Sequence, residues 1–221
     1  MTILTGSISA VLLDLDGTLA DSLGALRSAY CDFLSGLEIC PNEQEFQDLK
    51  GPSLNEIVRT LKNRYSLVPS EETLQKRYLA IVEDKYAREV NPLPGAIELL
   101  NALMRAGYAL ALVSSCPAQL TQAFLDRQGW QQYFGLLVSG DQVERSKPAP
   151  DIYRLALSSL KITPNQAMAL EDSPSGVKAA RAAGIATIGL GGAELIEAGA
   201  IGVVADLYSA AELLTASELA V

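Results

Sequence analysis

Short apolar runs without alternation recur along the chain and predict strands buried on both faces of a parallel sheet. They are residues 10–13, 108–113, 136–138, 167–170 and 186–190. Between them, apolar residues recur at helical spacing and predict amphipathic helices. These helices are expected over residues 96–105, 117–128, 151–160 and 173–183, with weaker elements near Val203 and at 209–214. This regular alternation predicts a parallel sheet with right-handed crossovers.

The alternation stops after Leu19, and the next seventy or so residues read as consecutive helices. We expect these over residues 21–34, 43–50, 53–63 and 70–90. The helices end at a segment rich in proline and glycine, Asn91-Pro92-Leu93-Pro94-Gly95, after which the alternation of strands and helices resumes. The sequence therefore predicts an α/β fold, with a Rossmann-like three-layer core (1–20 and 92–221) and an inserted all-helical domain (21–91).

Composition narrows the class of protein. Hydrophobic residues make up 49% of the 221 residues and charged ones 19%, which is typical of a globular protein with a sizeable core. The net charge of −9 argues against a nucleic-acid partner. No apolar run is long enough to predict a membrane span, and the first ten residues do not resemble a signal sequence. We therefore expect a cytoplasmic protein without a membrane partner.

The chain contains no histidine, which excludes Ser-His and Cys-His nucleophile pairs and histidine general bases. The three cysteines, Cys31, Cys40 and Cys116, match no zinc-binding spacing and suit a reducing compartment. Any catalysis is therefore expected to use carboxylates, lysine, hydroxyls and a hard metal.

Polar residues follow the predicted strands at their carboxyl ends, where open parallel sheets bind ligands. We expect them to meet at one edge of the sheet: Asp14, Asp16, Ser114, Ser115, Lys147, Glu171 and Asp172. Clustered oxygens without nitrogen or sulfur ligands suit Mg²⁺, and lysine with a helix N-terminus suits an anion. A cation and an anion held together are what phosphoryl transfer requires.

In this pattern the chain resembles the haloacid dehalogenase superfamily, in the subgroup with a helical cap that includes phosphoglycolate phosphatases and β-phosphoglucomutases. Four motifs in order carry the resemblance: Asp14-Leu15-Asp16-Gly17-Thr18, Ser114, Lys147 before Pro148, and Glu171-Asp172. The resemblance covers essentially the whole chain.

The resemblance implies a phosphatase that acts through an aspartyl-phosphate. Asp14 would be the nucleophile, and Asp16 the general acid and then the general base. Ser114 and the amide of Ser115 would bind the phosphoryl oxygens, and Lys147 would offset their charge. Where the family often has asparagine, Ser115 leaves its side-chain role open.

The resemblance also implies Mg²⁺ as the cofactor. The ligands would be the Asp14 and Asp172 carboxylates and the backbone carbonyl of Asp16, with Glu171 nearby or acting through water. An aspartate at position 16 is typical of phosphatases and phosphomutases within the superfamily, because dehalogenases lack it.

The helical insert is expected to close over the site and to determine which leaving groups it accepts. Gly51 and Ser53 in the Gly-Pro-Ser loop, together with Arg59 and Lys62 beyond it, are the candidate contacts for a small phosphorylated metabolite of phosphoglycolate or sugar-phosphate type. We expect a monomer or a homodimer.

Two alternatives remain open. A phosphomutase related to β-phosphoglucomutase would carry a histidine and an arginine where this chain has Leu26 and Leu54, so hydrolysis is favoured. A catalytically silent binding protein is disfavoured by the intact motifs.

Several residues near these motifs are interpreted as structural. Cys116 has no histidine partner and is expected to be inert. Tyr65, Tyr78 and Tyr86 are expected to pack in the helical domain or at its rim, and Trp130 to pack in the core.

Overall fold

A single parallel sheet forms the centre of the protein, and the computed structural model describes residues 8–49 and 51–216 of it. Within these residues the sheet has six strands in the order β5-β4-β1-β6-β7-β8, all parallel. The strands are β1 (Ala10–Leu13), β4 (Ala109–Ser114), β5 (Leu136–Ser139), β6 (Ala167–Glu171), β7 (Ala186–Leu190) and β8 (Gly202–Val204). The predicted α/β fold with a parallel sheet is confirmed.

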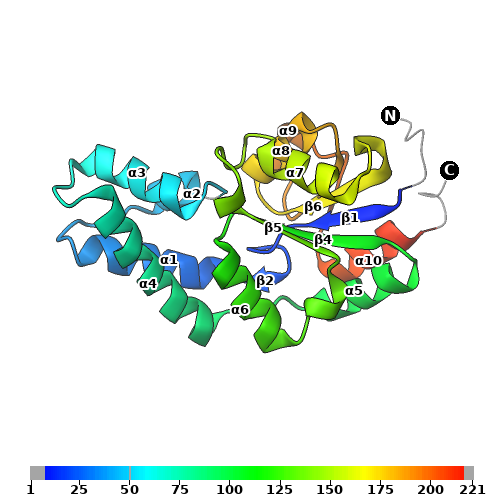
Figure 1. Ribbon diagram of the computed structural model, residues 1–221, viewed down its shortest axis with the longest axis horizontal. Coiled ribbons are helices and arrows are strands. Elements are labelled where there is room, and N and C mark those ends of the chain that lie inside the picture. Colours follow the sequence, from blue (N-terminus) through cyan, green and yellow to red (C-terminus); the bar gives the residue numbers. More distant parts are fainter. Residues whose placement is uncertain (1–7, 50, 217–221) are drawn as a thin grey trace.

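Helices cover both faces of the sheet and make a three-layer core (Figure 1). On one face lie α5 (Ala96–Arg105), α6 (Ala118–Gln128) and α10 (Leu207–Thr215), and on the other lie α7 (Asp151–Leu160), α8 (Pro174–Ala182) and α9 (Glu194–Ala198). Successive residues of β1 point to opposite faces of the sheet. Leu13 therefore packs in the hydrophobic core formed with α5, α6 and α10, and Leu12 packs in the core formed with α7 and α8. This double burial explains why β1 reads as a continuous apolar run.

The register places the carboxyl ends of three neighbouring strands side by side. Leu13 of β1 pairs with Leu112 of β4 on one side and with Leu170 of β6 on the other. The residues that follow these positions therefore meet at one edge of the sheet. That edge faces the helices inserted after β1 (Figure 1).

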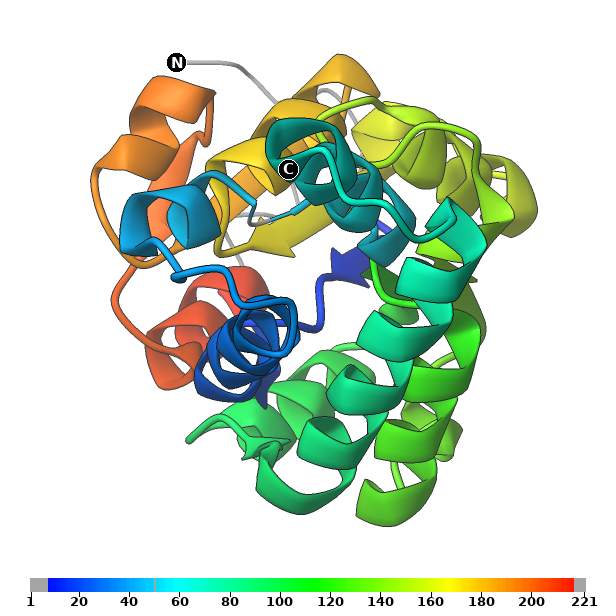
Figure 2. The same cartoon turned by 90° about the vertical axis from the view of Figure 1, so that its left-hand side faces the viewer.

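Four helices follow β1 within the described residues, and we call them the cap helices. They are α1 (Leu23–Ser35), α2 (Glu43–Asp48), α3 (Leu54–Tyr65) and α4 (Glu71–Glu89). Figure 2 views the protein from their side and shows them in front of the sheet. A short antiparallel ribbon of β2 (Ala20–Asp21) and β3 (Asn91–Pro92) joins them to the core. The position of this ribbon supports our proposal that residues 21–91 are one domain and that 1–20 and 92–221 form the other.

The observed elements differ from the predicted ones in a few places. Asp21 lies in β2, so α1 begins at Leu23 and not at residue 21. The predicted helix over 43–50 ends at Asp48, and its predicted last residue, Lys50, is outside the described residues. The sequence analysis missed the ribbon and α9, because two-residue strands and a five-residue helix are too short to show periodicity. No helix in the described ranges combines the length and apolarity needed to cross a membrane.

A buried carboxylate ties three of the cap helices together. Glu45 of α2 is 3% exposed and accepts hydrogen bonds from the hydroxyls of Tyr30 at 2.5 Å and Tyr65 at 2.9 Å. It also pairs with the guanidinium of Arg64. Since Tyr30 lies on α1 and the other two donors lie on α3, Glu45 fixes how α1, α2 and α3 pack.

Replacing Glu45 by Gln is expected to lower the free energy of unfolding by about 1–3 kcal/mol. The amide nitrogen of glutamine cannot accept the hydrogen bonds that the hydroxyl and guanidinium donors now give to a carboxylate oxygen. Urea denaturation measures the effect. Glu43→Gln on the same helix, which removes the exposed ion pair with Arg27, is the matched control and is expected to change stability little. Equal losses in both variants would contradict a special role for Glu45.

Candidate active site

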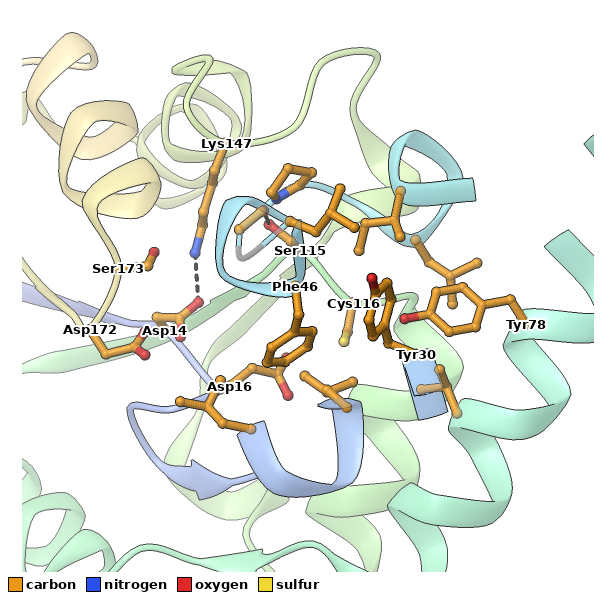
Figure 3. A pocket seen from close by; sticks show the side chains of 18 residues that line it. Asp14, Asp16, Tyr30, Phe46, Tyr78, Ser115, Cys116, Lys147, Asp172 and Ser173 are labelled. Carbon is orange, nitrogen blue, oxygen red and sulfur yellow. Dashed lines mark hydrogen bonds and ion pairs between the residues drawn. The ribbon is translucent and has the colours of Figure 1, made fainter. Parts of the chain in front are cut away.

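The residues predicted to meet at the sheet edge do meet there. β1 delivers Asp14, β4 ends at Ser114, and β6 ends at Glu171. Lys147 reaches the same point from the loop after β5, so that its ammonium faces Asp14 (Figure 3). Of the residues predicted to meet at this edge, those that line one cleft between the core and the cap helices are Asp14, Asp16, Ser115, Lys147 and Asp172. Ser114 and Glu171 are fully buried beside them and are not part of its lining.

Lys147 is the electrostatic centre of this edge. Its side chain is 2% exposed, and its Nζ lies 2.6 Å from Asp14 Oδ1, 2.6 Å from Glu171 Oε1 and 3.1 Å from the Val113 carbonyl oxygen. Burial alone would lower the pKa of Lys147, but the carboxylates of Asp14 and Glu171 raise it above its usual value. The ammonium is therefore charged and held in one position.

Glu171 orients Lys147 and is itself held by two hydroxyls. Its Oε1 also accepts a hydrogen bond from Tyr153 at 2.6 Å, and its Oε2 accepts one from Ser173 at 3.3 Å. The sequence analysis missed Tyr153, which lies on α7 at helical spacing with other core residues and carries no motif. Its ring packs 5.4 Å from the lysine ammonium, so the lysine is enclosed by groups that stabilise its charge.

Three carboxylates here could hold a metal ion. Asp14, Glu171 and Asp172 each offer one oxygen, and these oxygens lie within 4.8 Å of one another. Burial, followed by the charge of Glu171, raises the pKa of Asp172 to about 7. Burial also raises the pKa of Asp14 well above its usual value, and among its neighbours only Lys147 opposes this. The raised pKa values show that the ionised carboxylates repel one another when no cation lies between them. An all-oxygen donor set of this kind fits a hard divalent cation, which would favour the ionised form.

The chain approaches Asp172 closely at Gly17. This residue has a φ of +88°, and a Cβ built on it would lie 2.1 Å from Asp172 Oδ2. The hydroxyl of Thr18 faces the other carboxylate oxygen at 3.5 Å. A side chain at position 17 would therefore displace Asp172. This close approach and the positive φ explain why the Asp-Gly-Thr motif has a glycine at this position.

The carboxylate of Asp16 points away from this cluster. Its Oδ1 accepts a hydrogen bond from Tyr86 of α4 at 2.5 Å, and its Oδ2 accepts one from Ser114 at 3.3 Å. Burial and the charge of Asp16 raise the pKa of Tyr86, so this hydroxyl keeps its proton and donates. The sequence analysis placed Tyr86 in the interior or rim of the helical domain; it is buried and also contacts the site.

The two serines after β4 have different surroundings. Ser114 is fully buried, and its hydroxyl accepts a hydrogen bond from the backbone N–H of Cys116 at 3.0 Å. Ser115 lines the cleft, and its hydroxyl donates to the carbonyl of Gly51 at 2.6 Å. The side chain of Ser115 thus links core and cap. Burial raises the pKa of the Cys116 thiol well above its usual value, so the thiol stays protonated.

The loop before α3 fastens the cap helices to the core. The N–H of Ser53 donates to the hydroxyl of Ser146 at 2.9 Å, and the N–H of Ser146 donates to Glu56 at 3.4 Å. Ser53 also forms a capping box with Glu56 at the start of α3. Gly51 lines the cleft with a φ of +101°, and a Cβ there would lie 1.7 Å from Ser175 Oγ.

The structure does not bring Arg59 and Lys62 to the cleft. Arg59 is exposed, and the ammonium of Lys62 donates to the carbonyls of Leu67 and Pro69, both at 2.6 Å. The face of α3 that lines the cleft carries Leu54 and Ile57 instead. Helical spacing turns both basic residues away from the cleft.

Comparison with known proteins places the chain in a family. The sequence profile of the haloacid dehalogenase-like hydrolases matches residues 11–190. A phosphorylated carbohydrates phosphatase of Thermotoga maritima is 32% identical over 89% of this chain and 94% of its own length. A phosphoglycolate phosphatase of Salmonella typhi is 30% identical over 83% of this chain and 81% of its own length. The crystal structure of CbbY from Rhodobacter sphaeroides with phosphate superposes with a TM-score of 0.79 at 28% identity, over 90% of this chain and 95% of that one.

The chain therefore belongs to the haloacid dehalogenase-like hydrolase family. Within it, the chain is a phosphatase, a hydrolase of phosphoric monoesters, and it acts on phosphorylated small molecules.

Proposed function

We propose that this protein is a Mg²⁺-dependent phosphatase that hydrolyses a small phosphomonoester through an aspartyl-phosphate on Asp14. The observation that carries the proposal is the contact of the buried Lys147 ammonium with both Asp14 and Glu171, beside a carboxylate cluster that can accept a cation. The names of the two curated relatives support phosphoglycolate and phosphorylated carbohydrates as reference substrates.

In the first step, a carboxylate oxygen of Asp14 attacks phosphorus while the ester P–O bond breaks. The carboxyl group of Asp16 gives its proton to the leaving alkoxide. Asp16 then takes a proton from water, which attacks phosphorus and releases phosphate and the Asp14 carboxylate. The contacts of Asp16 with Tyr86 and Ser114 support this role, because they hold its carboxyl group in place.

The remaining roles concern charge. Lys147 offsets the negative charge on Asp14 and on the transferring phosphoryl group, and the amide of Ser115 binds a phosphoryl oxygen. For Ser114 to bind a phosphoryl oxygen as well, its buried hydroxyl has to turn away from Asp16. Asp14 and Asp172, with the backbone carbonyl of Asp16 and with Glu171 nearby, are the proposed Mg²⁺ ligands. When bound, Mg²⁺ supplies positive charge to the phosphoryl oxygens.

The cap helices exclude water from this reaction in our proposal. Their contacts with the core through Gly51, Ser53 and Glu56 support a closed position over the site. Leu26 and Leu54 line the cleft at the positions where a related phosphomutase would carry a histidine and an arginine. Hydrolysis is therefore favoured over phosphomutase activity, and the intact site disfavours a silent binding protein.

Removal of divalent cations tests this proposal. Hydrolysis of p-nitrophenyl phosphate is expected to fall to background in EDTA and to return when excess Mg²⁺ is added, because the carboxylate cluster needs a cation to bind a phosphate dianion. Equal rates with EDTA and with Mg²⁺ would contradict it. Phosphorus NMR on a hexose 1-phosphate is the control for the alternative, since a mutase would isomerise it without releasing free phosphate.

A further inference from the structure

The two ends of the cleft differ in chemistry. Among the described residues, the charged side chains that line it are Asp14, Asp16, Lys147 and Asp172, all from the core. The described residues of the cap helices that line it are apolar or tyrosine, among them Leu26, Phe46, Leu54, Ile57 and Val82. The free space in the cleft amounts to about 100 Å³, and the apolar cap residues bound the end that lies beyond the phosphoryl site.

On the cap side of this lining, the polar side chains of the described residues are two tyrosines, and one of them offers its hydroxyl to the cleft. The Tyr30 hydroxyl donates to Glu45 at 2.5 Å and accepts from the N–H of Asn42 at 3.1 Å, so the cleft meets its ring. Tyr78 is 4% exposed, and its hydroxyl points into the cleft without a hydrogen-bond partner among the described residues (Figure 3). Its ring is held against Phe33, with the ring centroids 4.9 Å apart.

The Tyr78 hydroxyl faces the space of the cleft, so a ligand bound there can replace water as its hydrogen-bond partner. Conversely, a polyhydroxylated or carboxylated leaving group would lose water against the leucines and phenylalanine of this wall and would gain one neutral partner in return. The described part of the cap-side lining therefore suits a leaving group that is apolar except at one point.

We propose that the preferred substrate is the phosphate ester of a mainly apolar alcohol that carries one uncharged hydrogen-bonding group, and that Tyr78 determines specificity by bonding to this group. This inference rests on the proposed phosphatase function and names its substrate class. It sets the preferred substrate apart from phosphoglycolate and from sugar phosphates. The reaction itself is the same cleavage of the P–O ester bond.

Four alkyl phosphates test the inference, with kcat/KM as the readout. They are 2-phenylethyl phosphate, 2-(4-hydroxyphenyl)ethyl phosphate, glycerol phosphate and phosphoglycolate. Both aromatic esters are expected to exceed the other two by about tenfold or more, and the hydroxylated one is expected to be the better of the pair. Preference for glycerol phosphate or phosphoglycolate would overturn the inference.

Variants of the two tyrosines separate a specific role for Tyr78 from a structural one. Tyr78→Phe is expected to abolish the preference for the hydroxylated over the plain aromatic ester, whereas Tyr30→Phe is expected to keep it. Lys50, which lies outside the described residues, is replaced by Met in a third variant, and the preference for aromatic esters is expected to persist. A preference that survives Tyr78→Phe would contradict the role of Tyr78. Absence of turnover on all four esters and on p-nitrophenyl phosphate would instead overturn the proposed function, and the inference with it.

Discussion

Replacing Asp14 by Asn is expected to reduce kcat for p-nitrophenyl phosphate by at least about 10⁴-fold, as the loss of a catalytic nucleophile does in other hydrolases. The amide cannot attack phosphorus, and it binds a cation more weakly than a carboxylate does. Its oxygen can still accept the hydrogen bond from Lys147, so the fold is expected to persist. Steady-state kinetics with saturating Mg²⁺ measures the effect.

The matched control is Asp126→Asn, which changes an exposed aspartate on α6 that contacts glutamine side chains. This variant is expected to keep the kcat of the unmodified protein. Circular dichroism on both variants establishes that they are folded. If Asp14→Asn kept more than about a tenth of the activity, the nucleophile would have to be another residue.

Replacing Lys147 by Met is expected to remove activity and also to lower the free energy of unfolding by about 3–5 kcal/mol, because it leaves buried carboxylates without their cation. Lys147 is 2% exposed, and both of its carboxylate partners are buried. The loss of activity follows from the loss of the charge that opposes the phosphoryl group. Urea denaturation measures the stability without added metal.

A triple variant separates the two effects. Lys147→Met combined with Asp14→Asn and Glu171→Gln removes all of these charges together, and replacing a whole buried charge group by neutral residues costs far less than breaking it. The triple variant is expected to regain most of the lost stability but no activity. A single Lys147→Met variant as stable as the unmodified protein would contradict the electrostatic role assigned to this lysine.

The sheet and its flanking helices could be predicted from the sequence, because burial on two faces leaves an apolar run and an amphipathic helix leaves a period. The helices over 96–105 and 151–160 and the strand over 186–190 have the predicted bounds. The β2–β3 ribbon could not be predicted in this way. It joins residues 20–21 to 91–92, and such a distant pairing leaves no local pattern.

The convergence of Asp14, Lys147 and Asp172 followed from one rule, that parallel strands place their carboxyl ends at one edge. The contacts of Tyr86 and Tyr153 did not follow, because an aromatic residue on a helix looks the same whether it packs in a core or donates to a carboxylate. Helical periodicity does not determine which group a side chain on a helix contacts, because tertiary packing decides this. The assigned roles of the site residues remain predictions.

Trapping the covalent intermediate tests the central claim most directly. The protein is mixed with Mg²⁺ and a saturating phosphomonoester, quenched in acid during turnover, and analysed by peptide mass spectrometry. The account predicts one phosphoryl group on Asp14, removable by hydroxylamine as expected of an acyl phosphate, and none in the Asp14→Asn variant. A phosphoryl group on another residue, or rapid turnover in Asp14→Asn, would contradict it.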